Sequence, residues 1–393
     1  MSKANRLKKH ILSFVIFLIW LCIAPPYSPA AEIDVGLVVP LTGKLAPAGR
    51  AVRNGALLAV EEINQTGGIS GNRLHAVITD TSSSPAGAAA AVKALVEEER
   101  VLVLAGGCGS SSALAAGFEA EENQIPLLVT TAADDRITEQ GWQNLFRLNA
   151  PASEHTKALE GYLSGLVNRN STAAVIFERG PLGDYGLKRF FRLQRRLGFR
   201  IISRVGYDPP RDDFREEILR IKGADPDIIC FICRAHEGAV LLRQVKEAGF
   251  ESSVLLAGTG DLLTPAFREL EGGAAEGLLG AAWWVPHVGY PGAAIFRENF
   301  IRRHNTEPDY WSAQGYSAMW VVADAIDRAD KLDRAGIRAS LEKTNLMTAY
   351  GPVKFEDYVH KKRQNRLPSL AVRWQRGLLR VVWPRNVAEE SIR

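Results

Sequence analysis

The sequence contains few cysteines and histidines and none of the motifs that usually mark an enzyme. There are four cysteines and seven histidines in 393 residues, and the histidines show no metal-ligand spacing. No G-x-S-x-G nucleophile elbow and no Walker-type loop with Gly-Lys-Ser/Thr occurs. The acidic pair Asp134 and Asp135 is interpreted as a helix cap rather than an acid/base dyad. We therefore predict a protein that is not an enzyme, with no catalytic residue, cofactor or metal.

The cysteines also fail to form a recognisable disulfide or metal site. Cys108 lies in a glycine-rich turn, and Cys230 and Cys233 form C-F-I-C inside an apolar segment that is expected to be a strand. Side chains three residues apart in a strand face opposite sides, so a local disulfide would need distorted geometry. We expect buried free thiols at these positions.

Beyond its first thirty residues the chain lacks an excess of either charge. The formal net charge of +4 comes from 48 basic and 44 acidic residues. Lys3, Arg6, Lys8 and Lys9 account for the whole excess, and no acidic residue occurs before residue 31. The remaining chain is formally neutral, which gives no indication of nucleic-acid or membrane-surface binding.

The first thirty residues have the three parts of a secretory signal peptide. A basic segment precedes an apolar run over 11–24, which is short for a transmembrane helix. Ser28 and Ala30 then provide small residues at the −3 and −1 positions of a cleavage site. A cleaved signal over 1–30 is favoured over an uncleaved anchor, and the bulky residues before Cys22 argue against a lipoprotein. We expect a periplasmic protein.

From residue 33 onward, apolar strand-like runs alternate with helical segments, in two successive blocks. The first block has expected strands at 33–41, 73–80, 101–106 and 125–130. The second has expected strands at 173–178, 200–207, 227–233 and 253–258. Nearly continuous apolar strands separated by helices predict parallel sheets covered on both faces. The fold class is therefore α/β, with two doubly wound, Rossmann-like units.

One stretch, "AGGCGSSSALAAG" over 105–117, combines the end of a strand, a glycine turn and a row of serines at a helix start. Backbone N–H groups and the helix dipole favour an anion at such a place. The carboxyl end of a parallel strand is also where open α/β sheets bind ligands. The alternative is that the serines only cap their own helix.

The wider sequence resembles the type I periplasmic solute-binding proteins, in the branched-chain amino-acid (Leu/Ile/Val) binding family of ABC transporters. The residues that carry the resemblance are "GLVVPLTG", "NGALLAVEEINQTGGISGNRLHAVITDT", "GGCGSSSALAA", "IPLLVTTAADDRIT" and "GPVKFED". The likeness covers 33–384 and implies a two-lobed clamshell with three crossover strands, near residues 151, 279 and 351. It places 31–151 and 280–351 in lobe 1, and 152–279 and 352–393 in lobe 2.

The resemblance assigns ligand-binding positions in lobe 1. Ser110 or Ser111 falls on the family serine, which grips the ligand carboxylate. Ala132 and Ala133 fall on the second binding loop, where an Ala and a Thr are usual. Ala48 stands where a tyrosine is common, so the pocket is altered here.

Lobe 2 departs from the family pattern more strongly. Tyr185 matches a cleft tyrosine, but Arg234 lies in the segment that normally brings another tyrosine. Thr259 falls on the acidic position that meets the ligand ammonium, and Asp261, two residues later, is the candidate substitute. Arg234 is either a bidentate donor for a ligand carboxylate or one half of a salt bridge at the cleft rim.

These changes lead to a hypothesis about the ligand and the partners. We expect an acidic or otherwise anionic small organic solute, an amide or an amino-acid derivative, rather than plain leucine. The implied partners are that small molecule and the membrane subunits of an ABC permease, with no nucleic acid and a monomeric chain. The alternative function is a periplasmic ligand-sensing protein that docks on a receptor instead of a permease.

Overall fold

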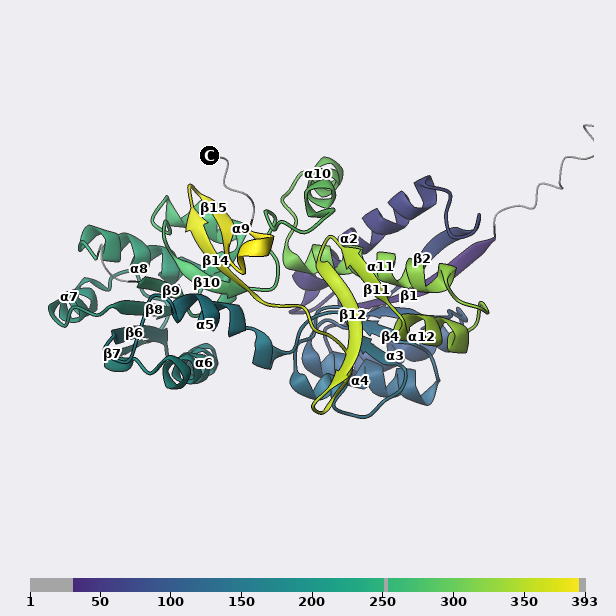
Figure 1. Cartoon of the computed structure of the whole chain (residues 1–393), viewed down its shortest axis with the longest axis horizontal. Coiled ribbons are helices and arrows are strands. Elements are labelled where there is room, and N and C mark those ends of the chain that lie inside the picture. The colour runs from purple at the N-terminus through teal and green to yellow at the C-terminus, as the bar shows by residue number, and fades with distance from the viewer. Residues whose placement is uncertain (1–30, 251–253, 389–393) are drawn as a thin grey trace, which may run out of the picture.

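The computed structural model describes residues 31–250 and 254–388 and shows two α/β lobes lying side by side (Figure 1). We define lobe 1 as the eight-stranded sheet with its helices, and lobe 2 as the seven-stranded sheet with its helices. The predicted signal peptide over 1–30, with Cys22, lies outside the described residues. The expectation of two doubly wound lobes is confirmed.

Lobe 1 has a mostly parallel sheet in the order β11-β12-β13-β5-β4-β3-β1-β2. Its strands are β1 Glu32–Val39, β2 Arg73–Asp80, β3 Leu104–Gly106, β4 Leu127–Val129, β5 Leu145–Arg147, β11 Asn345–Thr348, β12 Gly351–Tyr358 and β13 Lys361–Asn365. Its helices are α2 Ala46–Gln65, α3 Pro85–Glu97, α4 Ser110–Glu122, α10 Ala293–His304, α11 Tyr310–Asp327 and α12 Arg334–Glu342, with a short 3₁₀ helix η1 Asp135–Thr138. Strands β2, β1, β3, β4 and β5 run parallel, so their carboxyl ends share one edge.

Lobe 2 repeats this arrangement in the order β15-β14-β10-β9-β8-β6-β7. Its strands are β6 Thr172–Glu178, β7 Arg200–Tyr207, β8 Ile228–Ile232, β9 Val254–Ala257, β10 Leu279–Ala282, β14 Leu370–Gln375 and β15 Leu378–Trp383. Its helices are α5 Lys157–Leu163, α6 Pro181–Leu197, α7 Arg215–Gly223, α8 Ala235–Glu247 and α9 Pro265–Glu271, with 3₁₀ helices η2 Ala152–Glu154, η3 Gly260–Leu263 and η4 Arg385–Val387. The strands buried on both faces explain the unbroken apolar runs, as in β8, where all five residues are buried.

The chain crosses between the lobes three times, as expected, but two crossings lie later than the predicted boundaries. The first lies between β5 and β6. The second follows β10, which pairs with β9 and β14 in lobe 2 although 280 was expected to begin a lobe 1 segment. The third lies between β13 and β14, because β12 and β13 extend the lobe 1 sheet beyond residue 351. The alternation of apolar and polar residues along a strand shows which face of the strand is buried, but it does not show which sheet the strand joins.

Candidate functional site

The serine turn lies at the carboxyl end of β3, where the chain enters α4. Gly109 is the N-cap of α4 with φ 83°, and no side chain caps the helix, so the serines do not serve as its N-cap. Ser110 Oγ accepts a hydrogen bond from the backbone N–H of Asp134 at 3.3 Å. Ser111 is exposed, and no hydrogen bond of its side chain occurs within the described residues. Of the serines in this turn, Ser111 is therefore the one whose side chain is exposed without an internal hydrogen bond in the described part of the chain.

The loop after β4 is attached to this turn. The Thr130 hydroxyl donates to the Gly106 carbonyl at 2.9 Å, and the backbone N–H of Ala132 donates to the Gly107 carbonyl at 3.2 Å. Ala132 is buried and Ala133 is half-buried. The two loops consequently form one rigid surface at the edge of the lobe 1 sheet.

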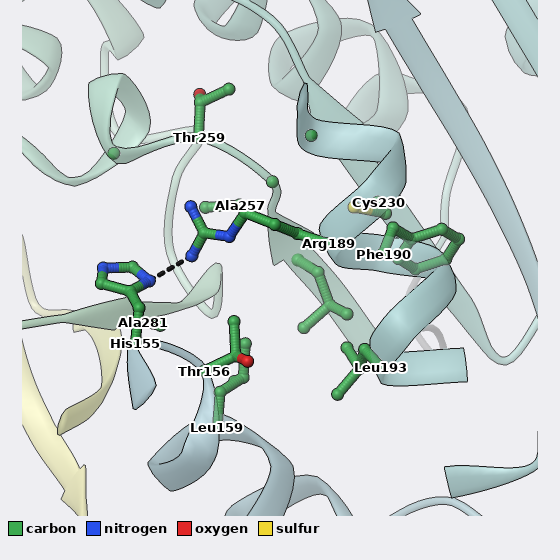
Figure 2. A pocket seen from close by; sticks show the side chains of 14 residues that line it. His155, Thr156, Leu159, Arg189, Phe190, Leu193, Cys230, Ala257, Thr259 and Ala281 are labelled. Atoms are coloured by element: carbon green, nitrogen blue, oxygen red, sulfur yellow. Dashed lines mark hydrogen bonds between the residues drawn. The ribbon is translucent and has the colours of Figure 1, made fainter. Parts of the chain in front are cut away.

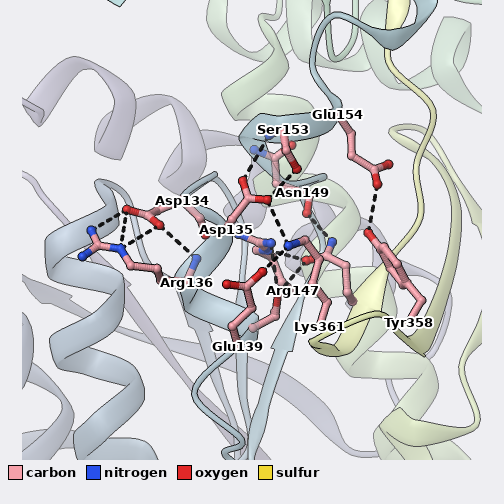
Figure 3. A network of polar contacts seen from close by, with 12 residues as sticks. Asp134, Asp135, Arg136, Glu139, Arg147, Asn149, Ser153, Glu154, Tyr358 and Lys361 are labelled. Atoms are coloured by element: carbon pink, nitrogen blue, oxygen red, sulfur yellow. Dashed lines mark hydrogen bonds and ion pairs between the residues drawn. The ribbon is translucent and has the colours of Figure 1, made fainter.

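A buried arginine donates a hydrogen bond to the loop after β4 (Figure 3). Arg147, at the end of β5, is 0 % exposed and donates to the Asp134 carbonyl at 2.5 Å. Its other hydrogen bonds reach Thr138 Oγ1 at 3.1 Å and Gln364 Oε1 at 2.5 Å. Burial lowers the pKa of Arg147 to about 10, against the effect of Asp135 and other anionic groups, so the guanidinium remains charged at neutral pH.

The same network reaches the first crossing between the lobes (Figure 3). Asp135 accepts a 2.5 Å hydrogen bond from the Ser153 hydroxyl and lies 2.9 Å from Lys361 Nζ, which also contacts Glu139 at 2.5 Å. Burial acts to raise the pKa of Asp135, but the hydrogen bonds from Ser153 and Lys361 together lower it by more, so the net shift is downward. Asp134 caps η1 by accepting from the backbone N–H of Arg136, as the sequence predicted for this acidic pair. The loop after β4 is therefore connected to the segment that leads into lobe 2.

In lobe 2, the sequence-predicted residues lie at the carboxyl ends of β6, β8 and β9. Tyr185 is exposed near the start of α6. Arg234 occupies the N-cap position of α8 without a side-chain cap, and its Nε lies 3.4 Å from Oε2 of the buried Glu178. The structure thus shows the ion pair that was one of two alternatives for Arg234.

The remaining two predicted residues of lobe 2 follow β9. Thr259 donates its hydroxyl to the Cys233 carbonyl at 2.7 Å. Desolvation raises the pKa of Asp261, and the charge of Arg234 opposes this shift. The Thr259 hydroxyl is therefore used in a hydrogen bond within the fold. The Asp261 carboxylate lies close enough to Arg234 for the two charges to interact.

Tyr310 is a further candidate residue for this site, and the sequence did not indicate it. It follows Asp309, which caps α11 by accepting from the backbone N–H of Ser312 at 2.8 Å. Burial raises the pKa of Tyr310, and electrostatic interactions with Asp309, Cys108 and Asp261 raise it further. Cys108 belongs to the serine turn of lobe 1 and Asp261 to lobe 2, so Tyr310 lies where the two faces approach each other. The only sequence signal is a tyrosine after a helix cap, which does not indicate a ligand site.

The thiols do not take part in this site as reactive groups. Cys108, Cys230 and Cys233 are buried and free, which confirms the sequence expectation. Burial raises the pKa of Cys108 to about 11 and the pKa of Cys230 to about 12. Thiols of this kind are protonated at neutral pH and are poor nucleophiles or metal ligands.

One group within the described residues has the spacing of metal ligands, and it lies away from this edge. Glu32, Asp34 and His75 bring ligand atoms within 4.8 Å of one another near the amino-terminal ends of β1 and β2. The group is largely exposed, and Asp34 and His75 already pair at 2.8 Å. Within the same part of the chain, no helix combines the length and the apolar character needed to cross a membrane.

The loop after β1 is held by Asp80, whose titration gives a testable prediction. Asp80 accepts hydrogen bonds from the Thr42 hydroxyl and the Leu41 N–H, both at 2.7 Å. The Thr42 hydrogen bond and backbone N–H groups lower the pKa of Asp80 to about 2, against a smaller opposing effect of desolvation. An NMR titration should give this pKa, and Thr42→Val should move it upward towards the ordinary value of about 3.9.

The lowered pKa also fixes the sign of the effect of Asp80 on stability. The ionised carboxylate is stabilised in the folded protein, so its contribution is complete above the unfolded pKa and is lost as the pH falls through about 2. Thr42→Val should reduce that loss. A pKa of Asp80 that does not change in Thr42→Val would contradict the assignment.

Comparisons with known proteins cover nearly the whole chain. A sequence model of the family described as "Periplasmic binding protein" matches residues 32–377. Leu/Ile/Val-binding protein homolog 7 of Brucella abortus is 24% identical over 404 aligned residues, which cover 98% of this chain and 99% of that protein. The leucine-, isoleucine-, valine-, threonine- and alanine-binding protein of Pseudomonas aeruginosa is 25% identical, over 84% of this chain and 88% of that protein.

Solved structures show the same fold. The branched-chain amino acid transporter substrate-binding protein LivJ of Streptococcus pneumoniae, in complex with isoleucine, has a TM-score of 0.69 at 22% identity, over 88% of this chain and 97% of that one. A solute-binding protein of an ABC transporter from R. palustris, in complex with benzoate, has a TM-score of 0.67 at 21% identity, over 90% of this chain and 96% of that one. Proteins with this architecture therefore hold amino acids in one case and an aromatic acid in another.

Proposed function

Because the chain belongs to the periplasmic binding protein family, we propose that it is the substrate-binding subunit of an ABC importer. It captures an amino acid or a related small organic solute, with a preference for an anionic one, between its two lobes. The closed complex then delivers the solute to the permease. The observation that carries this proposal is the family match over 32–377. Ser111 supports it, because this exposed serine at the start of α4 forms no side-chain hydrogen bond within the described residues.

The proposed binding surface combines residues of both lobes. Lobe 1 offers the hydroxyl of Ser111 and the backbone N–H groups at the start of α4, which suit a ligand carboxylate. Lobe 2 offers the Asp261 carboxylate, which suits an ammonium group. The proposed ligand contacts are Ser110, Ser111, Ala132, Ala133, Tyr185, Arg234, Thr259 and Asp261, together with Tyr310.

The two lobes act in this proposal as rigid units that close on the ligand. The three connections between the sheets supply the hinge, and the solute stabilises the closed arrangement because it contacts both faces only there. In this scheme residues 1–30 direct export and are removed after Ala30. Amino-terminal sequencing of the exported protein should begin at Ala31, and an exported chain that retains residue 1 would contradict the cleavage.

A ligand screen by thermal unfolding tests the proposed function. A solute that binds only the folded protein adds about 2.7 kcal/mol of stability at a hundredfold excess over its dissociation constant. Branched-chain, acidic and aromatic amino acids, amides, benzoate and small carboxylic acids form the panel. We expect at least one of them to raise the unfolding midpoint and to bind with one-to-one stoichiometry in calorimetry. A folded protein that binds none of these compounds would contradict the proposal.

A further inference from the structure

Lobe 2 contains a cavity of about 40 Å³ between helices α5 and α6 and the carboxyl ends of β8, β9 and β10 (Figure 2). Much of its wall is apolar, with Leu159, Phe190 and Leu193 among the lining residues. A water molecule needs about 10–15 Å³ of such space. The cavity therefore has room for a few water molecules or for one carboxylate group, but only for one end of a ligand.

The side chain of Arg189 enters this cavity from α6 (Figure 2). Burial lowers the pKa of Arg189, yet an arginine remains charged at neutral pH. Its guanidinium donates to Nδ1 of His155, and it lies 5.7 Å from the centre of the Tyr185 ring. Burial, and then the charge of Arg189, holds the pKa of His155 well below its ordinary value, so the imidazole is neutral.

No carboxylate of the described residues forms an ion pair with Arg189. A desolvated cation without a counter-ion is unfavourable, and buried charges are normally paired. Arg234 differs because it is more exposed and already lies 3.4 Å from Glu178. Arg147 differs because backbone and side-chain oxygens accept its hydrogen bonds. Arg189 is thus a partly buried positive charge with no carboxylate partner among the described residues.

The cavity adjoins the proposed ligand surface. Thr259 and Gly260 line it, and Figure 2 shows the Arg189 guanidinium between His155 and Thr259. Tyr185 lies next to Arg189 on α6. The guanidinium therefore lies beside Thr259 and Tyr185, two of the proposed ligand contacts of lobe 2.

We propose that Arg189 binds a second carboxylate of the ligand, which makes the solute a small dicarboxylate or an acidic amino acid. The inference rests on the proposed capture of a solute between the lobes. The planar guanidinium offers two parallel N–H donors to a carboxylate, which favours this group over an amide of the same shape. A ligand held by the serine turn at one end and by Arg189 at the other links the two lobes directly.

Calorimetry with Arg189→Met tests the inference. The probes are succinate, L-aspartate and L-glutamate, each compared with its monoamide: succinamate, L-asparagine and L-glutamine. We expect the wild-type protein to bind at least one acid more tightly than its amide. Arg189→Met should weaken binding of that acid by about 100-fold, since a charged hydrogen-bond partner is lost, with little effect on the amide. Arg192→Met, an exposed arginine on the same helix, is the matched control and should retain the wild-type ratio.

The ratio of the affinities for an acid and for its amide distinguishes this role from a structural one. Arg189 also donates to His155, so Arg189→Met is expected to lower the midpoint of thermal unfolding in either role. A purely structural arginine would weaken binding of the acid and of its amide alike, whereas a ligand-binding arginine would weaken binding of the acid selectively.

Two outcomes would overturn the inference without affecting the proposed function. One is an Arg189→Met protein that keeps the wild-type preference for acid over amide. The other is a wild-type protein that binds leucine or benzoate but none of the three acids. The absence of any ligand in the wider thermal screen would instead contradict the proposed function itself.

Discussion

Replacing Ser111 with aspartate is expected to weaken binding of a carboxylate ligand by roughly 1,000-fold, because like charges placed together at a contact cost several kcal/mol. Ser111 is exposed near the start of α4, and its side chain forms no hydrogen bond within the described residues. The new carboxylate would occupy the position assigned to the ligand. A negative charge in the first turn of a helix stabilises that helix by about 0.3–1 kcal/mol, so the folded protein should not lose stability.

The matched control for this change is Ser111→Asn, which has a similar size and no charge. We expect Ser111→Asn to bind the ligand far more tightly than Ser111→Asp, with both proteins unfolding at or above the wild-type temperature. Calorimetry with the tightest carboxylate ligand of the screen provides the measurement. Equal affinities of Ser111→Asp and the wild-type protein would show that the ligand carboxylate lies elsewhere.

Replacing Arg147 with leucine is expected to lower the free energy of unfolding by roughly 3–5 kcal/mol, because it leaves buried acceptors without their donor. The acceptors are the Asp134 carbonyl, Thr138 Oγ1 and Gln364 Oε1. The nearby Asp135 and Glu139 would also lose the attraction of the Arg147 charge. Because the carbonyl belongs to the segment that follows Ala132 and Ala133, ligand affinity should fall as well.

Chemical denaturation of Arg147→Leu and Arg136→Leu measures this effect. Arg136 is exposed and pairs with Asp134 at 2.7 Å. It therefore serves as a control that contacts the same loop but has no buried hydrogen bond. Exposed ion pairs contribute about 0–1 kcal/mol, and Arg136→Leu should change stability by no more than that. A similarly small change in Arg147→Leu would mean that the network of Figure 3 does not hold the loop.

The sheets of both lobes could be predicted because their strands are buried on both faces. The segments that became β6 and β8 are nearly continuous apolar runs, and helices separate them at regular intervals. The start of α3 also agrees with a known sequence signal, since Ser84 accepts from the Gly87 N–H and Pro85 follows at the first helical position. Local sequence determines such features directly.

The crossings after β10 and β13 could not be located in this way. Strand β12 alternates buried and more exposed residues in its first half, which would suit either sheet. Its place in lobe 1 depends on β13, which pairs with β5 through Gln364 and Arg147. That contact joins residues 217 positions apart, and no local pattern indicates it.

The residues of the candidate site differ in how far the sequence indicates them. The glycine-serine turn was recognisable because it combines a strand end, a tight turn and a helix start in one short stretch. Tyr310 and Arg189 were not, because each owes its position to elements that meet only in the folded chain. Arg189 follows Tyr185 by one helical turn on α6, and nothing in the sequence shows that no carboxylate of the described residues pairs with it.

Small-angle X-ray scattering of the protein with and without its ligand tests the central claim most directly. The claim is that two lobes, joined by three connections, close on a small solute that contacts both. We expect the radius of gyration to fall when the tightest ligand of the screen is added, and to remain unchanged with Ser111→Asp at the same ligand concentration. A wild-type protein that is saturated with ligand, as calorimetry shows, and yet keeps the radius of gyration of the free form would contradict the account.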